Sequence, residues 1–233
     1  MRLSKRIHTL ADKVKAGETA ADIGTDHGYV PMLLLRNNIS PRVIMSDISE
    51  GSLAKARETF AMTGLPVDDR DFRVGDGLDT LLPGEVDDII IGGLGGFTII
   101  NILEKDENKS RSFSKLIMQP RKHSGALRHY LYTHGWDIVD EDLAPEGKFV
   151  CEIITAVYSG ICPRTAPYPE DDIRWKYPAE AALTHPELSA KRISWKIGSI
   201  EEEIRNLAAS RSDKTGEITA LEKDRLYLQK LVK

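Results

Sequence analysis

The stretch Ala20–Tyr29, with the sequence AADIGTDHGY, constrains the fold of this chain more than any other segment. A short apolar run ends in Asp22, and two glycines, Gly24 and Gly28, follow with Asp26 between them. The pattern predicts a strand that leads through a tight turn into a helix, because glycine lets a ligand approach the backbone of such a turn closely. The alternative is an ordinary strand–turn–helix junction without a ligand.

The carboxylates of this turn favour a cationic ligand. A diphosphate needs backbone N–H groups and positive charge, so Asp22 and Asp26 would repel it. S-adenosylmethionine carries a sulfonium and an ammonium group, and it suits these charges better than a dinucleotide does. The sequence therefore predicts S-adenosylmethionine as the cofactor.

Three further apolar segments also end in glycine or aspartate. Val43–Ile48 contains Asp47 about twenty residues after the first turn, where a doubly wound sheet places a carboxylate on ribose hydroxyls. Phe72–Gly77 carries Asp76 in a Gly-Asp-Gly turn, and Asp88–Gly96 ends in a glycine-rich turn. Because parallel strands end at the same edge of a sheet, these segments predict one binding crevice.

The later segments predict an α/β fold with a Rossmann-like, mostly parallel sheet that ends in an antiparallel hairpin. Trp136–Leu143 and Phe149–Tyr158 are separated only by Ala144–Lys148, which predicts two strands of a hairpin. This ending is typical of class I methyltransferases, whereas a dinucleotide-binding domain would continue with β-α-β units. Further elements are expected at residues 3–15 (helix), 115–120 (strand) and 123–134 (helix).

The C-terminal part has a different pattern. Five of the eleven prolines lie in residues 161–186, which predicts a connector. Two apolar stripes with helical spacing follow and predict an antiparallel, coiled-coil-like helical hairpin. The stripes consist of Ile193, Ile197, Ile200, Ile204 and Leu207, and of Ile218, Leu221, Leu228 and Val232. We therefore expect a methyltransferase domain over 1–160, a connector over 161–186 and a helical hairpin over 187–233.

Composition and charge limit the functional class. The 233 residues are 41% hydrophobic and 29% charged, as in soluble globular proteins. We expect a cytoplasmic protein without membrane contact, because no apolar run approaches ~18 residues and no secretory signal is evident. Cys151 and Cys162 form no motif, so we expect no metal.

The net charge is −4, but the cations are clustered. Residues 1–15 carry Arg2, Lys5, Arg6, Lys13 and Lys15 against one acid, and residues 115–128 carry Lys115, Arg121, Lys122 and Arg128 with none. The hairpin adds Lys191, Arg192, Lys196, Arg205 and Arg211. A basic rim around an acidic pocket suits a polyanionic substrate and a cationic cofactor. The alternative is that these cations lie on solvated helix faces.

The order of the motifs resembles the bacterial tRNA (adenine-22-N1)-methyltransferase family, often called TrmK. The similar segments are Leu3–Arg6, Ala21–His27, Gly75–Gly77, Gly92–Gly96, Leu116–Pro120 and Gly147–Lys148. With the C-terminal hairpin, the resemblance covers nearly the whole chain. It implies a class I domain that transfers a methyl group from S-adenosylmethionine to N1 of an adenine in the tRNA D-arm.

The resemblance also implies roles for individual residues. The expected cofactor-binding residues are Asp22, Gly24, Asp26, His27, Gly28, Asp47, Ile48, Asp76, Gly77, Gly92 and Gly93. Asp47 corresponds to the ribose-binding acid, and Asp76 and Gly77 to the position where the adenine ring is recognised. The expected substrate-binding residues are Lys5, Arg6, Tyr29, Leu94, Gly95, Phe97, Arg121 and Lys122. Leu94 and Arg121 depart from the family pattern, which has Met and Asn at these positions.

The chemistry suggests catalytic candidates. Adenine N1 attacks through an in-plane lone pair and becomes part of a cationic ring, which a nearby carboxylate would stabilise. Asp26 is the candidate, with His27 beside it; the alternatives are that Asp26 binds the cofactor or holds the loop, and that His27 caps a helix or packs. Tyr29 and Phe97 are candidate stacking platforms for an extruded base, or else line the pocket or core.

Two absences narrow the reaction. The fourth strand lacks the Asn/Asp-Pro-Pro-Tyr/Phe run that engages an exocyclic amine, which favours a ring nitrogen as the target. No cysteine lies near the fourth or fifth turn to serve as a nucleophile for pyrimidine C5. Three alternatives remain open: another RNA base, a small-molecule substrate, and a non-enzymatic module that binds S-adenosylmethionine or a partner. The sequence leaves the oligomeric state open.

Overall fold

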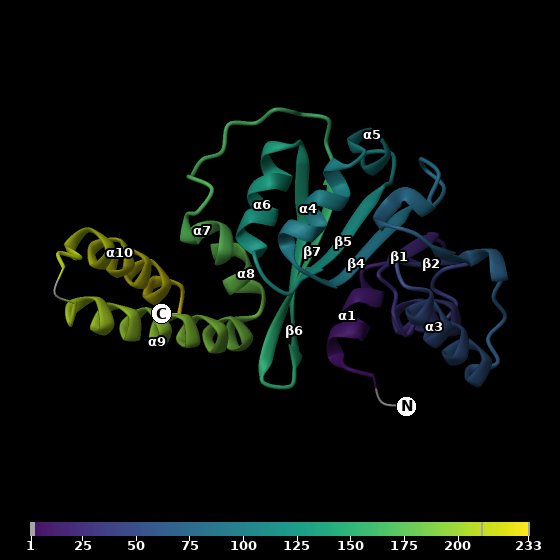
Figure 1. Ribbon diagram of the computed structural model, residues 1–233, viewed down its shortest axis with the longest axis horizontal. Coiled ribbons are helices and arrows are strands. Elements are labelled where there is room, and N and C mark those ends of the chain that lie inside the picture. Colours follow the sequence, from purple (N-terminus) through teal and green to yellow (C-terminus); the bar gives the residue numbers. More distant parts are fainter. Residues whose placement is uncertain (1–2, 211, 233) are drawn as a thin grey trace.

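The computed structural model describes residues 3–210 and 212–232, without the side chains of residues 182 and 183. The predicted cations Arg2 and Arg211 lie outside the described residues. The described chain forms one seven-stranded sheet with helices on both faces, and a pair of long helices extends from one side (Figure 1). No helix among the described residues is long and apolar enough to cross a membrane.

The strand order is β3-β2-β1-β4-β5-β7-β6, and the first five strands of the chain are parallel. They are β1 (Ala20–Ile23), β2 (Val43–Asp47), β3 (Phe72–Val74), β4 (Asp88–Leu94) and β5 (Lys115–Pro120). The last two strands, β6 (Trp136–Glu146) and β7 (Phe149–Tyr158), form an antiparallel hairpin at the edge, with β7 against β5. The predicted Rossmann-like fold with a terminal hairpin is confirmed.

Helices cover both faces of the sheet because alternate strand residues point to opposite sides. On one face, Met45 and Ile90 pack in a cluster with α1 (Lys5–Asp12), α2 (Tyr29–Arg36) and α3 (Glu50–Thr63). On the other face, Ile44 and Ile89 pack in a cluster with α4 (Gly96–Glu104) and α6 (Ser124–Thr133). Short helical segments are α5 (Glu107–Ser110), η1 (Asp69–Asp71) and η2 (Gly77–Thr80). The parallel strands are therefore covered on both sides, and ligands can reach them at the strand ends.

Two boundaries differ from the prediction. The helix predicted over 3–15 is shorter, because Ser4 is extended, with ψ 155°, and the helix ends at Asp12. The hairpin connection predicted over Ala144–Lys148 is wrong, because β6 continues to Glu146 and Pro145 pairs with Val150. Proline is tolerated there because β6 is an edge strand and needs no N–H donor on its open side.

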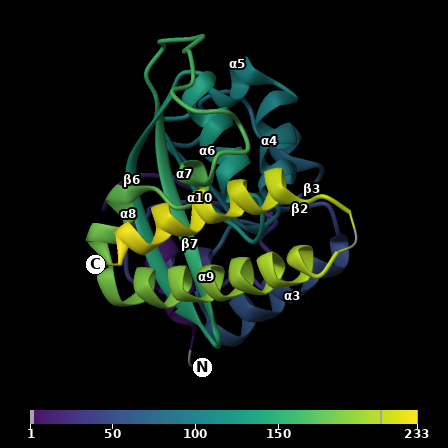
Figure 2. The ribbon, with the colours of Figure 1, turned by 90° about the vertical axis from the view of Figure 1, so that its left-hand side faces the viewer.

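The C-terminal helical hairpin is confirmed. The segment after β7 contains α7 (Ile173–Lys176) and α8 (Ala179–Thr184), and α9 (Pro186–Ala208) and α10 (Thr215–Leu231) then lie antiparallel, side by side (Figure 2). Ile193, Ile200 and Leu228 form their buried core with Tyr177 of the connector, whereas Val232 is exposed. The division into parts at residues 160 and 186 stays a prediction.

Ion pairs fix the start of α9 on the sheet. Glu152 of β7 accepts a hydrogen bond from Arg128 of α6, and Arg192 of α9 pairs with the same carboxylate at 2.7 Å. Both arginines lower the pKa of the Glu152 carboxyl against the opposing effect of its burial. His185 lies 2.6 Å from Asp142 of β6. The hairpin is thus held beside β6 and β7 by charged contacts.

Candidate active site

Two adjoining cavities lie at the C-terminal ends of the parallel strands. The first, which we call the β2 cavity, has a volume of about 530 Å³ and includes Asp47 and Ile48 in its lining. The second, the α1 cavity, has a volume of about 390 Å³ and includes Asp22 and Arg6. Gly24 and Leu94 line both cavities, so the end of β1 and the end of β4 separate them.

The β2 cavity combines one buried carboxylate with apolar walls. Asp47, at the end of β2, accepts hydrogen bonds from the backbone N–H groups of Asp26 (3.2 Å) and Ser49 (2.9 Å). A carboxylate has about four acceptor positions, so acceptors remain for a ligand. Ile48 is 73% exposed above the cavity, and Leu78 and Ile102 line its wall. The cavity therefore offers an apolar slot beside a hydroxyl acceptor.

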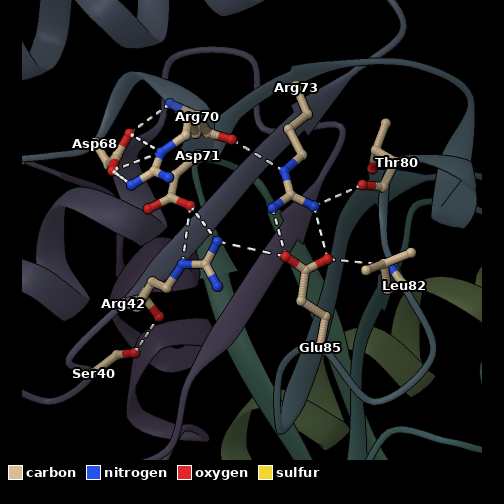
Figure 3. Close-up of polar contacts among 9 residues, drawn as sticks. All are labelled: Ser40, Arg42, Asp68, Arg70, Asp71, Arg73, Thr80, Leu82 and Glu85. Carbon is tan, nitrogen blue, oxygen red and sulfur yellow. Dashed lines mark hydrogen bonds and ion pairs between the residues drawn. The ribbon is translucent and has the colours of Figure 1, made fainter.

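A charged network holds the loop that forms one wall of the β2 cavity (Figure 3). Arg73 of β3 donates to the carbonyl oxygen of Thr80 at 2.8 Å and pairs with Glu85, which Arg42 also approaches. The hydrogen bonds from Arg73 hold the pKa of Glu85 down to about 2. The Thr80 hydroxyl in turn donates to Ser46 of β2 at 2.9 Å. The loop from Gly75 to Glu85 is thereby fixed to β2.

Asp76 and Gly77, predicted beside the adenine ring, lie in this wall. Asp76 pairs with Lys105 at 2.8 Å, and Lys105 also pairs with Asp79 at 2.6 Å. The two carboxylates raise the pKa of the Lys105 ammonium above its usual value. A Cβ on Gly77 would come within 3.1 Å of Ile102, so the absence of a side chain lets this wall pack closely.

The α1 cavity contains a buried acid beside a cation. Asp22 lies one residue before the end of β1 and accepts a hydrogen bond from the Thr25 hydroxyl at 2.8 Å. Burial raises the pKa of Asp22 to about 6, although Thr25 and the nearby Arg6 oppose the shift. Arg6 of α1 pairs with Glu146 at 2.8 Å, at the end of β6. The predicted substrate cation Arg6 is thus held between the cavity and the hairpin.

Gln119 was not among the site residues predicted from the sequence. It connects Gly93 and Arg6, two residues that line the α1 cavity. It is buried at the end of β5, where its side-chain oxygen accepts from the N–H of Gly93 at 3.1 Å and from Arg6 at 3.4 Å. Its side-chain amide donates to the carbonyl oxygen of Pro120. The signal that could have identified it is its place at a strand end, which also marks Asp22 and Asp47.

Asp26 and His27 lie at the mouth of the α1 cavity. Asp26 has a left-handed backbone, with φ 47°, and its carboxylate pairs with Lys55 of α3 at 2.8 Å. The His27 ring stacks on the ring of Tyr29 with 5.1 Å between centroids. All three predicted residues line the cavity, so the carboxylate and an aromatic surface lie on the same side of the site.

The other predicted residues divide between the cavity and its surroundings. Gly92, Gly93, Leu94 and Arg121 line the α1 cavity. Gly28 is buried at the start of α2, where a Cβ would come within 3.1 Å of the Ala56 Cβ. Phe97, exposed at the start of α4, packs against the His123 ring in a tilted arrangement with 4.5 Å between centroids. Lys5, Gly95 and Lys122 line neither cavity. Lys5 and Lys122 are exposed, and Gly95 is half-buried.

The side chains that line the two cavities suit one kind of ligand. Among residues 3–210 and 212–232, no group of three His, Cys, Asp or Glu side chains is arranged to hold a metal ion. The β2 cavity fits a nucleoside, because it pairs an apolar slot with the Asp47 carboxylate. The α1 cavity fits a cationic chain, because Asp22 and Asp26 both line it. S-adenosylmethionine combines these two parts.

A Rossmann-like sheet with glycine-rich turns and carboxylates at its C-terminal edge, closed by an antiparallel hairpin, defines a class I methyltransferase. The chain belongs to the methyltransferase domain family, whose family model matches residues 3–154. This match covers the sheet from the start of α1 into β7 and leaves out the connector and the helical hairpin.

Comparisons with individual proteins are more specific than the family model. The chain is 34% identical to the tRNA (adenine(22)-N(1))-methyltransferase of Bacillus subtilis over 156 residues, which are 67% of this chain and 65% of that enzyme. The match thus covers just under two thirds of that relative's length. The crystal structure of B. subtilis TrmK has a TM-score of 0.76 at 25% identity and covers 100% of this chain and 99% of its own. The resemblance predicted from the sequence is confirmed.

A further solved structure shares the fold. A Streptococcus pneumoniae protein in complex with S-adenosyl-L-methionine has a TM-score of 0.77 at 23% identity, with 100% of both chains covered. It shares the fold of this chain, including the C-terminal helices.

Proposed function

We propose that this protein transfers a methyl group from S-adenosylmethionine to N1 of an adenine in tRNA, at position 22 of the D-arm, in the cytoplasm. The observation that carries the proposal is the pair of adjoining cavities at the strand ends, one suited to a nucleoside and one to a cationic chain. The similarity to the B. subtilis tRNA (adenine(22)-N(1))-methyltransferase supports the substrate.

The residues divide the work between the two cavities. Asp47 would accept hydrogen bonds from the ribose hydroxyls, and Ile48 would cover the adenine ring of the cofactor. Asp22 would attract the ammonium group of the methionine chain. The cofactor supplies an electrophilic methyl group. The protein therefore needs mainly to position the target adenine of the tRNA and to exclude water. Asp26 lines the α1 cavity together with Asp22. Its carboxylate would stabilise the positive charge that develops on the target adenine ring of the tRNA.

The experiment that tests the proposal combines the purified protein with an unmodified bacterial tRNA transcript and methyl-labelled S-adenosylmethionine. We expect one methyl group per tRNA, mapped to adenine 22 as 1-methyladenosine, and no product from a transcript with guanine at that position. Turnover of a small molecule without RNA, or cofactor binding without any transfer, would favour one of the alternatives.

Replacing Asp47 by alanine should weaken cofactor binding. Each charge-assisted hydrogen bond contributes about 1.5–3 kcal/mol, so the dissociation constant should rise at least about tenfold in titration calorimetry. Asp47→Asn, which keeps one acceptor oxygen for the Ser49 N–H, is the matched control and should lose less. An unchanged affinity in a folded Asp47→Ala protein would mean that the ribose lies elsewhere.

Cofactor affinity should depend on pH through Asp22. Its pKa in the free protein is about 6, and only the ionised carboxylate attracts an ammonium group, so affinity should be complete above this value and fall below it. Between about pH 8 and about pH 5 the dissociation constant should rise about tenfold. Asp22→Asn should bind weakly with little pH dependence. His27→Gln is the control, because histidines in general change charge in this range.

A further inference from the structure

Aromatic and basic side chains gather where the turn between β6 and β7 meets α9. Lys148 comes from the turn and Phe149 from the start of β7. Lys191, Trp195 and Lys196 come from the first half of α9. They line a groove of about 240 Å³, which we call the Trp195 groove. In the view of Figure 1 the turn between β6 and β7 lies between α1 and the start of α9.

Two of the three aromatic side chains that line the groove are exposed, and the third, Tyr177, is buried. Phe149 is 58% and Trp195 56% exposed, whereas the other two tryptophans, Trp136 and Trp175, are buried. Large aromatic side chains that contribute little to the core and lie together on a surface are typical of binding sites. Trp195 therefore has a surface role that the packing of α9 and α10 does not require.

The charge around the groove is positive. Within the described residues, no carboxylate forms an ion pair with Lys148, Lys191 or Lys196. Burial lowers the pKa of the neighbouring Lys176, and the positive charges of Lys196 and Arg192 lower it further. Arg192 itself is held by Glu152 and by the carbonyl oxygen of Lys176, so it forms the floor of the groove. The three lysines remain available for a polyanion.

The groove is linked to the α1 cavity through the same turn. Arg6 lines the cavity and pairs with Glu146, which immediately precedes the Gly147–Lys148 turn. Arg121 also lines the cavity, and Lys122 is exposed beside it. A polyanion that enters the α1 cavity over this rim can therefore continue along the turn to the Trp195 groove.

We propose that the Trp195 groove binds an unstacked nucleotide of the tRNA, separate from the adenine that is methylated. Its base would stack on Trp195 and Phe149, and its phosphates would contact Lys148, Lys191 and Lys196. Exposed aromatic rings between cations are the usual means of holding unstacked RNA bases. The groove is smaller than the ~300 Å³ at which pockets for larger ligands begin, so it suits one base. The inference rests on the proposed function.

The main test is the affinity for an unmodified tRNA transcript. Trp195→Ala should raise the dissociation constant about 5- to 150-fold, the range measured for loss of one base–aromatic stack. The single-turnover methylation rate at saturating tRNA and the cofactor affinity should not change. The matched control is Leu226→Ala, because Leu226 is 54% exposed on α10, outside the groove, and this variant should bind tRNA normally.

Two further measurements separate stacking from charge. Because Trp136 and Trp175 are buried, tRNA should quench mainly the fluorescence of Trp195, and Trp195→Phe should lose this signal. Replacing Lys148 and Lys196 by alanine should reduce the slope of log affinity against log salt by roughly 0.7–0.9 for each phosphate that a lysine no longer neutralises. Lys230→Ala, at an exposed position on α10, should leave the slope unchanged.

The outcomes distinguish the two proposals. If the wild-type protein methylates tRNA while Trp195→Ala binds it with unchanged affinity, the groove assignment is wrong and the proposed function stands. If no tRNA is methylated, the proposed function fails, whatever the groove binds. If Trp195→Ala alters the sedimentation of the free protein and not its tRNA affinity, the groove contacts a second copy of the chain, and the inference is overturned.

Discussion

Replacing Gly96 by alanine should lower the methylation rate about 100-fold, because the new side chain would overlap the backbone. A Cβ on Gly96 would overlap the carbonyl oxygen of His123 and lie 2.9 Å from that of Lys122, which already accepts a hydrogen bond from the Gly96 N–H. No flexible side chain can move aside, so the turn after β4 must separate from the turn after β5. These turns carry Leu94 and Arg121, and a displacement of about 1 Å in a site costs about 100-fold in rate.

The preceding glycine provides the control. Gly95 has φ −73°, and the nearest atom to an added Cβ is the Thr98 hydroxyl at 3.5 Å, an ordinary contact. Gly95→Ala should therefore leave the two turns in contact, so its unfolding temperature should stay close to the wild-type value and its methylation rate should exceed that of Gly96→Ala. Single-turnover methylation and thermal unfolding measured on both variants test this contrast. Equal rates for the two variants would mean that the approach of the two turns does not shape the site.

Local sequence shows where a strand ends, and much of the candidate site lies at strand ends. Many of the site residues could therefore be predicted from the sequence. Asp22, Asp47 and Asp76 each lie at or just after the end of an apolar run, and parallel strands end at one edge of the sheet. The structure accordingly places all three around the two cavities. Their roles in binding stay predictions, but their proximity follows from the alternation of strands and helices.

Contacts between distant segments could not be predicted in the same way. Arg6 was expected to meet the substrate directly, yet it pairs with Glu146, 140 residues later in the chain. That pairing depends on how far β6 extends beyond β5, and the hairpin connection was predicted wrongly. The pairing of Asp26 with Lys55 likewise depends on how α3 packs beside the first turn. The pattern of residue types along the chain does not indicate which side chains of distant segments come into contact.

Asp26→Asn should lower the single-turnover methylation rate by about 100-fold while most of the cofactor affinity remains. The substitution removes the negative charge that would stabilise the cationic adenine ring, and one well-placed electrostatic group contributes an effect of this size. Asparagine keeps the shape of the side chain and tolerates the left-handed backbone at this position, with φ 47°. The fold should therefore be preserved, which thermal unfolding can verify.

Substituting Lys55, the ion-pair partner of Asp26, distinguishes three possible roles of Asp26: action on the adenine ring, binding of the cofactor, and support of the loop. Lys55 holds the carboxylate in an exposed ion pair, which contributes little to stability, so Lys55→Met should free the carboxylate without lowering the rate if Asp26 acts on the adenine ring. If Asp26 pairs with the cofactor ammonium instead, Asp26→Asn should reduce cofactor affinity together with the rate. If the ion pair only holds the loop, Lys55→Met and Asp26→Asn should impair the enzyme equally. Cofactor titration and single-turnover methylation on the same preparations distinguish these results, and near-normal values for Asp26→Asn in both would exclude Asp26 from the reaction.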